Sequence, residues 1–531
     1  MRLAFVLLLI VVAPLAAQEK KNSAIDYFNS GTILLNNKEY DKAIADLTKS
    51  IELDPKFAPA FSNRGIAWKN KKDFDKAIAD YTQAIELNPK VVGSFTNRAL
   101  AWSEKKEHDK AIADYTKAIE LDPKAAAIFI NRANVWLSKN EHDKAIADYS
   151  LAIEINPQFA LAFYNRGVVW LGKKAYDKAI ADLSKSIELN PKYASAFVNR
   201  GVAWADKKEY EKAVADYSQA IELDPKDVGA VFNRANVWLN TKQYDKAVAD
   251  YSQAIELNPR YTGAFINRAK ALFEKKEYDK VIADCTRAIE LDPNVAAAYL
   301  NRAEAWMEKK DYDKAIPDLT KLIQLAPKDT TALNDRAFAW SQKNEFDKAI
   351  ADLSKVIELD PKNVSAYSNR GSMYVEIKDY DKAITDYSKV LEVKPNDVEV
   401  RARRGSAFSR KKEYEKAMAD FSKAMELDPN HGAAFNGLAW LHATCPVEKY
   451  RDGKKAVELA LKVIKLRDSG STRDTLAAAY AEAGDFDRAV SEQRKALEDK
   501  MLSKESRERM EKRLELYLAK KPYRDENRDE G

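Results

Sequence analysis

Residues 58–91 read APAFSNRGIAWKNKKDFDKAIADYTQAIELNPKV, and variants of these 34 residues follow one another through most of the 531-residue chain. One proline marks the phase of the repetition and recurs every 34 residues, at Pro55, Pro89, Pro123, Pro157, Pro191, Pro225, Pro259, Pro293, Pro327, Pro361, Pro395 and Pro429. An unbroken phase indicates one structural unit that is repeated, and this period is typical of helix-turn-helix arrays. We therefore expect one long all-α array rather than a single central core.

Each unit is predicted to contain two helices. Phe61, Gly65 and Trp68 lie at helical spacing, so they share one face of a first helix, helix A. A polar turn follows, and Asp75 is expected to cap a second helix, helix B, through its side-chain oxygen. Helix B must end before Pro89, because proline cannot continue a helix and pushes the preceding residue toward an extended conformation.

Small and large side chains recur at fixed positions of the unit. Gly65 and Ala77 are expected to face each other, since two helices approach closely only where neither carries a bulky side chain. A tryptophan stripe at one phase is predicted to belong to the core. Its members are Trp68, Trp102, Trp136, Trp170, Trp204, Trp238, Trp306 and Trp340.

The composition limits the classes of partner. Hydrophobic residues make up 46% of the chain and charged residues 32%, which fits a soluble helical protein. The net charge of +5 comes from 88 basic and 83 acidic residues that are interspersed along the sequence. No long-range field results that would attract phosphate backbones, so nucleic-acid binding is not expected.

These features resemble the tetratricopeptide repeat family over twelve full units, residues 24–431. The period, the small-residue pair and the terminal proline all coincide with the pattern of that family. The resemblance implies a right-handed superhelical solenoid of antiparallel helix pairs, in which helix A lines a concave groove that holds extended peptide segments. It also implies a non-catalytic protein, because members of the family mostly have no catalytic activity.

An asparagine occupies one position of helix A in most units, and in the family this position points into the groove. The members of this asparagine row are Asn63, Asn97, Asn131, Asn165, Asn199, Asn233, Asn267, Asn301 and Asn369. An amide side chain both donates and accepts hydrogen bonds, so it can bind a peptide group in either direction. Each bond contributes ~0.5–1.5 kcal/mol, and a row of them supports micromolar affinity. Alternatively, the asparagines bond to neighbouring groups and stabilise only the stack. Asn134 and Asn236 are expected to add further amides to the groove.

The residue after each asparagine departs from the family, which commonly has leucine there. Arginine occupies this position in eleven consecutive units, as Arg64, Arg98, Arg132, Arg166, Arg200, Arg234, Arg268, Arg302, Arg336, Arg370 and Arg404. An aspartate, such as Asp80, recurs on helix B of every unit. Either each arginine lies along the helix pair and binds an aspartate of its own or a neighbouring unit, or the arginines form a cationic track for acidic ligands.

The register of the repeats breaks after Pro429. Residues 432–501 are predicted to form two irregular units of the same kind, the first with an insertion of five residues near Cys445. Residues 502–519 are expected to form a charged helix that caps the stack, and residues 520–531 a disordered tail.

The N-terminal residues 1–17 resemble a secretory signal peptide, with Arg2 ahead of an apolar run and small residues at Ala16 and Ala17. The run is short for a bilayer span, so no stable membrane span is expected and the protein is predicted to be exported, either periplasmic or secreted. An uncleaved anchor is the competing interpretation. Cys285 and Cys445 lie almost five units apart, so no disulfide between them is expected in an array with local contacts.

The sequence contains no phosphate-binding loop, nucleophile elbow or metal-ligand cluster, so neither a catalytic site nor a cofactor is predicted. We expect a protein-protein interaction scaffold that binds extended peptide through the asparagine row. The alternative is an accessory or assembly factor of an exported or envelope complex that acts through its irregular C-terminal units. The sequence leaves the partner and the oligomeric state open.

Overall fold

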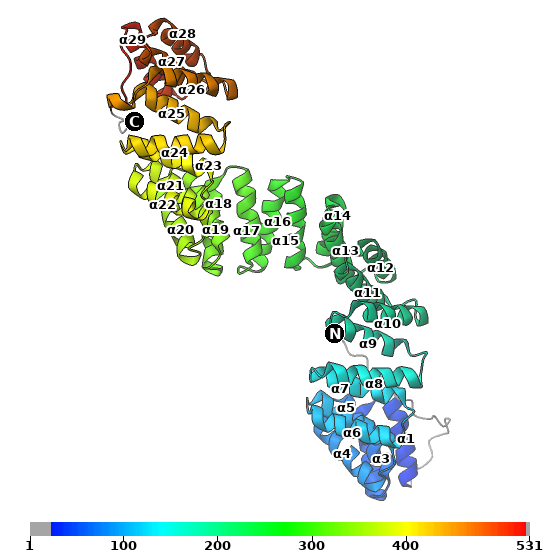
Figure 1. Ribbon diagram of the computed structural model, residues 1–531. Helices are drawn as coiled ribbons and strands as arrows, with labels where there is room; N and C mark the ends of the chain where they lie inside the picture. Colours follow the sequence, from blue (N-terminus) through cyan, green and yellow to red (C-terminus); the bar gives the residue numbers. More distant parts are fainter. Residues whose placement is uncertain (1–22, 527–531) are drawn as a thin grey trace. The chain divides into compact units, whose positions relative to one another are not determined.

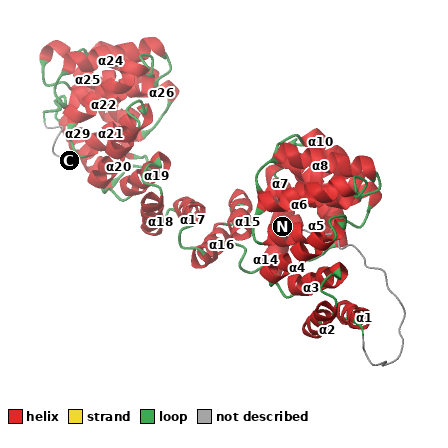
Figure 2. Cartoon of the chain, turned by 90° about the horizontal axis from the view of Figure 1, so that it is seen from below, coloured by secondary structure: helices red, strands yellow, loops and turns green. Residues whose placement is uncertain are grey.

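A computed structural model describes residues 23–526, and all regular secondary structure in this range is helical (Figures 1 and 2). The predicted leader, residues 1–17, lies outside the described residues. The helices α1 to α24 form twelve consecutive pairs, and each pair is one repeat, with helix A first and helix B second. The prediction of an all-α solenoid built from helix pairs is thus confirmed.

The bounds of the twelve helices A are α1 Ala24–Asn36, α3 Ala58–Asn70, α5 Val92–Glu104, α7 Ala126–Ser138, α9 Ala160–Gly172, α11 Ala194–Asp206, α13 Val228–Asn240, α15 Thr262–Glu274, α17 Ala296–Glu308, α19 Thr330–Gln342, α21 Val364–Glu376 and α23 Val398–Arg410. The bounds of the helices B are α2 Tyr40–Leu53, α4 Phe74–Leu87, α6 His108–Leu121, α8 His142–Ile155, α10 Tyr176–Leu189, α12 Tyr210–Leu223, α14 Tyr244–Leu257, α16 Tyr278–Leu291, α18 Tyr312–Leu325, α20 Phe346–Leu359, α22 Tyr380–Val393 and α24 Tyr414–Leu427.

A tight turn joins the two helices of each repeat. In the second repeat, Lys72 adopts a left-handed conformation with φ +65°. The N–H of Lys72 bonds to the carbonyl of Lys69, and the N–H of Asp73 bonds to the carbonyl of Trp68. This is a Schellman motif, which satisfies the last carbonyls of helix A and reverses the chain within three residues.

The cap of helix B lies two residues earlier than predicted. Asp73, not Asp75, accepts the N–H of Lys76 through its side chain. Asp75 lies in the first turn of α4, where its carboxylate forms an ion pair with Lys105 of the next repeat. Because Lys72 adopts the left-handed conformation, helix B begins directly after Asp73, and the capping position falls on that residue.

The glycine at the helix crossing also packs against an aromatic ring that the prediction did not include. A Cβ placed on Gly65 would lie 2.7 Å from Cε1 of Tyr81, and at the same phase of the first repeat a Cβ on Gly31 would lie 3.3 Å from the carbonyl oxygen of Ala43, the equivalent of Ala77. Tyrosines at this phase are among the largest fully buried side chains. The tryptophans predicted for the core are only partly buried, as Trp68 is, and Lys76 Nζ lies 4.3 Å from the Trp68 ring centroid. A ring at the edge of the repeat is covered by a lysine, which stacks on the indole.

The chain divides into two compact units, residues 1–267 and 268–531, and the boundary falls within α15. Within the first unit, α1 contacts α3, α3 contacts α5, and α11 contacts both α9 and α13. Within the second unit, α25 contacts both α23 and α27. Neighbouring helices A therefore lie side by side in these parts of the array, and we call the surface that the helices A of one unit present its helix-A face.

The last elements depart from the regular pairs. They are α25 Gly432–Thr444, a 3₁₀ helix Glu448–Tyr450, α26 Gly453–Leu466, α27 Gly470–Glu482, α28 Phe486–Leu497 and α29 Lys504–Leu518. Eight residues connect α25 to α26, whereas three residues separate helices A and B in the regular repeats.

Residues 520–526, predicted to be disordered, instead lie against α25 and α27. The indole N–H of Trp440 donates to the Asp525 carboxylate at 2.9 Å, and Arg524 forms an ion pair with Glu482 at 2.6 Å. Asp525 is buried as a result. The polar composition of the segment suggested disorder, but its charges find partners on the helices.

None of the helices in residues 23–526 has the length and apolar character that crossing a bilayer requires.

Packing of the glycine against the tyrosine ring leads to a stability prediction. A Cβ on Gly201 would lie 2.8 Å from Cε1 of Tyr217. Gly201→Val should lower the free energy of unfolding by ~1–3 kcal/mol, because the added methyls overpack this crossing. Gly201→Ala is the matched control and should cost less, since Ala235 stands at the same phase in the repeat that carries Tyr251. Urea denaturation and amide hydrogen exchange in α11 and α12 measure both; equal stability of the valine and alanine variants would contradict the assignment.

Candidate functional site

The recurrent arginines bind the aspartates of helix B. Arg64 donates from Nε and Nη2 to the two carboxylate oxygens of Asp80, at 2.8 and 2.7 Å. Its Nη1 donates to the hydroxyl of Thr48 in the preceding repeat at 3.0 Å. One guanidinium thus joins helix A and helix B of its own repeat to helix B of the repeat before. Burial raises the pKa of Asp80, and the hydrogen bonds from Arg64 oppose this shift.

The same two-pronged pairing recurs in all eleven repeats that carry the arginine. The aspartates are Asp80, Asp114, Asp148, Asp182, Asp216, Asp250, Asp284, Asp318, Asp352, Asp386 and Asp420. The bond to a hydroxyl of the preceding repeat goes to Thr48, Thr82, Thr116, Ser150, Ser184, Ser218, Thr286, Thr320, Ser354 and Ser388. The pairing with aspartate is confirmed, and the alternative of a cationic track is wrong because the guanidinium groups are already occupied.

Sequence reasoning missed the hydroxyl partner. Its signal was available, because a serine or threonine stands 16 residues before each arginine with the same period as the proline. A hydroxyl next to a guanidinium also relieves the cost of burying the donors that the carboxylate does not reach.

The asparagine row divides between the two compact units. Seven members, Asn63 to Asn267, belong to the first unit, whereas Asn301 and Asn369 belong to the second. Asn63, Asn131 and Asn301 are buried, with 6%, 2% and 7% of their surface exposed. In this conformation a peptide on the helix-A face does not reach them.

Several asparagines bond to the helix A of the preceding repeat. Asn63 Nδ2 donates to the Thr32 hydroxyl at 2.8 Å, and Asn267 Nδ2 donates to Asn236 Oδ1 at 2.9 Å. Lys69 donates to Asn97 Oδ1 at 3.2 Å. These contacts favour the role in the stack that the sequence left open for the row, and they place the asparagines along the seam between neighbouring helices A.

Three consecutive members of the first unit keep unused hydrogen-bonding groups. Asn165 and Asn233 are half-buried and bond to no other side chain among the described residues. Asn199 donates to the Tyr164 hydroxyl at 3.1 Å and to the Ser195 carbonyl at 2.8 Å, which leaves its side-chain oxygen as an acceptor. We call Asn165, Asn199 and Asn233 the central triad.

Aromatic pairs flank the central triad. The ring centroids of Tyr164 and Tyr193 lie 4.6 Å apart, and those of Phe232 and Tyr261 lie 4.7 Å apart. All four rings are half-buried, so each pair presents part of its surface beside the amides. Rigid aromatic surface next to amide groups is a combination that suits peptide recognition.

Asn134 and Asn236 do not serve as free amides of a groove. Each accepts a hydrogen bond from the buried tyrosine of its own repeat, Tyr149 at 2.5 Å and Tyr251 at 2.6 Å. In contrast, the hydroxyls of Tyr81 and Tyr115 have no hydrogen-bond partner within residues 23–526, since Ile66 and Leu100 stand at the same phase. These two asparagines therefore supply hydrogen-bond acceptors to buried tyrosine hydroxyls of the core.

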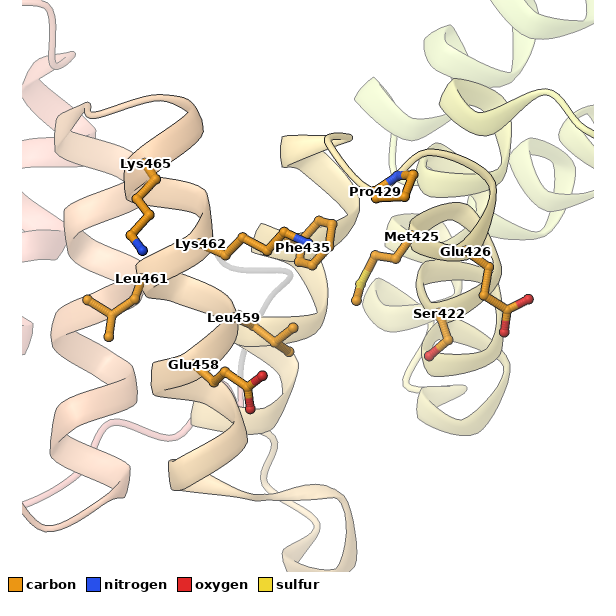
Figure 3. A pocket seen from close by; sticks show the side chains of 10 residues that line it. All are labelled: Ser422, Met425, Glu426, Pro429, Phe435, Glu458, Leu459, Leu461, Lys462 and Lys465. Atoms are coloured by element: carbon orange, nitrogen blue, oxygen red, sulfur yellow. The ribbon is translucent and has the colours of Figure 1, made fainter.

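A hollow of about 880 Å³ lies between α24, α25 and α26 (Figure 3). Met425, Phe435 and Leu459 supply much of its apolar wall, and the Lys462 side chain extends toward the Phe435 ring, with Nζ 4.1 Å from the ring centroid. The other half of its lining is polar or charged, namely Ser422, Glu426, Glu458, Lys462 and Lys465.

Metal and thiol chemistry gain no support from the described residues. No group of three or more potential ligands is found in residues 23–526. Cys285 and Cys445 are buried free thiols, and burial raises the pKa of Cys285 to about 12. A buried thiol with a raised pKa is a poor nucleophile, which fits a packing role for Cys285.

Family comparison covers most of the chain. Residues 58–91, 93–125, 160–193, 194–227, 230–261, 263–295, 364–397 and 398–431 match the family described as Tetratricopeptide repeat. A second family of the same description matches residues 296–329, a third matches residues 27–57, and one described as TPR repeat matches residues 134–174 and 341–377. The sequence matches no curated protein.

Solved structures with similar architecture match parts of the chain. YrrB, described as a TPR protein with an unusual peptide-binding site, is 26% identical over 35% of this chain and 95% of its own, with a TM-score of 0.32. The C-terminal part of a TPR repeat-containing protein from Cytophaga hutchinsonii is 20% identical over 45% and 98%, with a TM-score of 0.41. PilF of Pseudomonas aeruginosa is 19% identical over 38% and 92%, with a TM-score of 0.34.

Removal of one arginine should show how much its contacts stabilise the array. Arg200→Met leaves the carboxylate of Asp216, which is 6% exposed, without its partner and should cost roughly 3 kcal/mol of unfolding free energy. The double variant Arg200→Met/Asp216→Leu should regain most of this loss. Chemical denaturation measures the three proteins.

The exposed ion pair of Lys117 and Glu120 in the third repeat provides the control. Lys117→Gln should change the unfolding free energy by less than about 1 kcal/mol, because water screens this pair. A loss at Arg200 no larger than that at Lys117 would contradict the proposed role of the buried pair.

Proposed function

Because the chain belongs to the tetratricopeptide repeat family, we propose that it is a non-catalytic interaction scaffold that binds an extended peptide of a partner protein along the helix-A face of its first unit. The observation that carries the proposal is the central triad, in which three successive repeats present amides with unused hydrogen-bonding groups on one face. Of the other six members of the row, Asn97 and Asn267 extend the proposed site within the first unit. The buried Asn63, Asn131 and Asn301 lie outside it, and so does Asn369 of the second unit.

The chemistry of the triad suits a peptide backbone. Each amide can pair with a backbone N–H or C=O, and its partner choice does not depend on the peptide side chain. A strand-like peptide leaves both groups of its backbone free for such bonds, whereas a folded surface has them satisfied already. The triad therefore selects for extended segments.

The surroundings of the triad narrow the type of peptide. The arginines of the same helices are paired with aspartates, so they add no free positive charge to this face. Tyr164, Tyr193, Phe232 and Tyr261 offer partly exposed aromatic surface instead. A neutral segment with apolar side chains fits these neighbours best.

A second candidate function is that of an accessory or assembly factor whose irregular C-terminal units contact the partner. It is favoured by the way α29 and residues 520–526 close a polar cavity against the helix-A face of the second unit. The two functions use different compact units, so one protein can carry both.

Export is part of the proposal. Residues 1–17 are expected to be removed, which makes Gln18 the first residue of a periplasmic or secreted protein. N-terminal sequencing and intact mass of the protein from its native host should both report this end. A protein that keeps Met1 and sediments with membranes would contradict cleavage and support the competing interpretation of an anchor.

Replacement of the central triad tests peptide binding. Peptides selected from a random library on the full-length chain should bind Asn165→Ala/Asn199→Ala/Asn233→Ala at least tenfold more weakly in fluorescence anisotropy. The reason is that three hydrogen bonds of ~0.5–1.5 kcal/mol each are lost.

The matched control removes three asparagines outside the helix-A face. Asn156, Asn190 and Asn258 each cap helix B ahead of a proline and accept one backbone N–H. Their triple alanine variant should keep the affinity of the unchanged protein. Equal affinities of the two triple variants would rule out the triad as the peptide site.

A further inference from the structure

A polar cavity of about 770 Å³ lies within the second unit, where α29 crosses the helix-A face. Glu376 of α21, Arg410 of α23, Trp440 of α25 and Asp474 of α27 line one side. Residues of α29 and of the segment 520–526 line the other side. The cavity is therefore assembled from the regular array, the irregular repeats and the terminal helix together, and it has no counterpart among the regular repeats.

A buried ion pair fixes the wall that α29 contributes. Arg513 donates from Nε and Nη2 to the Asp474 carboxylate at 2.9 and 2.8 Å, and the two residues are 8% and 5% exposed. The Arg513 guanidinium also lies 5.4 Å from the Trp440 ring centroid and 5.3 Å from that of Tyr523. A guanidinium held by a carboxylate and two rings has little freedom, so the cavity is formed before any ligand arrives.

The charges of the lining are unequal. Five of its charged residues are basic, namely Lys378, Arg410, Arg509, Lys512 and Arg513, against the three acidic residues Glu376, Asp474 and Asp525. Arg513 is neutralised by Asp474, and Arg509 pairs with Glu505. Arg410 and Lys512 are exposed and bond to no other residue in the described part of the chain. The cavity thus presents two cations that no carboxylate binds, against one exposed carboxylate, Glu376, so its lining keeps a net positive charge.

One acceptor of the lining also lacks a donor. The side-chain oxygen of Asn436 is buried and has no hydrogen-bond partner among residues 23–526. Because this oxygen has almost no accessible surface, a ligand in the cavity does not reach it, and the charges of the lining decide the class of ligand.

We propose that this cavity, which we call the α29 cavity, binds an acidic peptide segment of a partner protein. Carboxylates of the segment pair with Arg410 and Lys512. The proposal rests on the second candidate function, contact through the C-terminal units, and gives that contact its ligand class. It does not depend on the central triad.

Fluorescence anisotropy on the full-length chain tests this assignment with two labelled peptides, Gly-Ser-Glu-Glu-Glu-Ser-Gly and its counterpart with three glutamines. The acidic peptide should bind more tightly, and Arg410→Gln/Lys512→Gln should weaken its binding about tenfold or more, because two charge-assisted hydrogen bonds are lost. The control Lys412→Gln/Lys504→Gln removes the same charge from positions outside the lining and should change affinity less than about twofold. If the double variant loses helicity, Lys512→Glu takes its place with the same expected loss.

Each other outcome decides against the proposal. Equal weakening by the control variant would mean diffuse attraction, and equal binding of the glutamine peptide would keep the second candidate function but remove the acidic ligand. A single-stranded oligonucleotide that binds more tightly than the peptide, and loses affinity in the same double variant, would assign the cavity to nucleic acid instead. The central-triad variant should bind the acidic peptide unchanged, so failure here leaves the first proposal intact.

Discussion

The bidentate contact between arginine and aspartate is the constraint on which the array depends. A buried carboxylate such as Asp80 is costly without a partner, and its partner is placed 16 residues earlier on helix A of the same repeat. The third donor of the arginine reaches the hydroxyl of the preceding repeat. Each repeat therefore completes its own polar network only when its neighbour is in register, which couples nearest neighbours in a quasi-linear stack.

The ends of the array show which residues replace the arginine where a regular neighbouring repeat is missing from the described part of the chain. Ser30 stands at the arginine phase of the first described repeat, where no described helix B precedes it, and its hydroxyl donates to Asp46 at 2.5 Å. A short side chain suffices there, because the described residues offer no hydroxyl of a preceding repeat. At the other end Leu438 takes the phase, and the pair of Arg513 and Asp474 joins α29 to α27 instead. A buried pair of arginine and aspartate is thus present at this end too, but it joins other helices than in the regular repeats.

The fold could be predicted because everything that decides it is periodic: the proline, the small residues and the aromatic residues recur at fixed phases. The position of the cap was missed because a lysine, rather than glycine, takes the left-handed conformation at Lys72. The state of each asparagine could not be predicted, since it depends on which residue the preceding helix A offers, such as Thr32 for Asn63. Contacts across irregular segments carry no period at all, and the bond from Trp440 to Asp525, 85 residues apart, is the clearest case.

Residues that are the same in every repeat and residues that differ between repeats have different physical roles. The arginine, the aspartate and the hydroxyl satisfy one another, so none of the three can change alone without leaving a buried group unpaired. Positions on the seam between helices A do not belong to this network of paired groups. At a single phase of the seam the residue varies from Thr96 through Ile130 to Tyr164. The recurrent arginines and aspartates already bind one another. Substitutions at the seam can therefore alter the shape and polarity of the helix-A face without breaking the ion pairs that join the repeats. Different parts of one array can therefore present different surfaces while the network that joins the repeats stays the same.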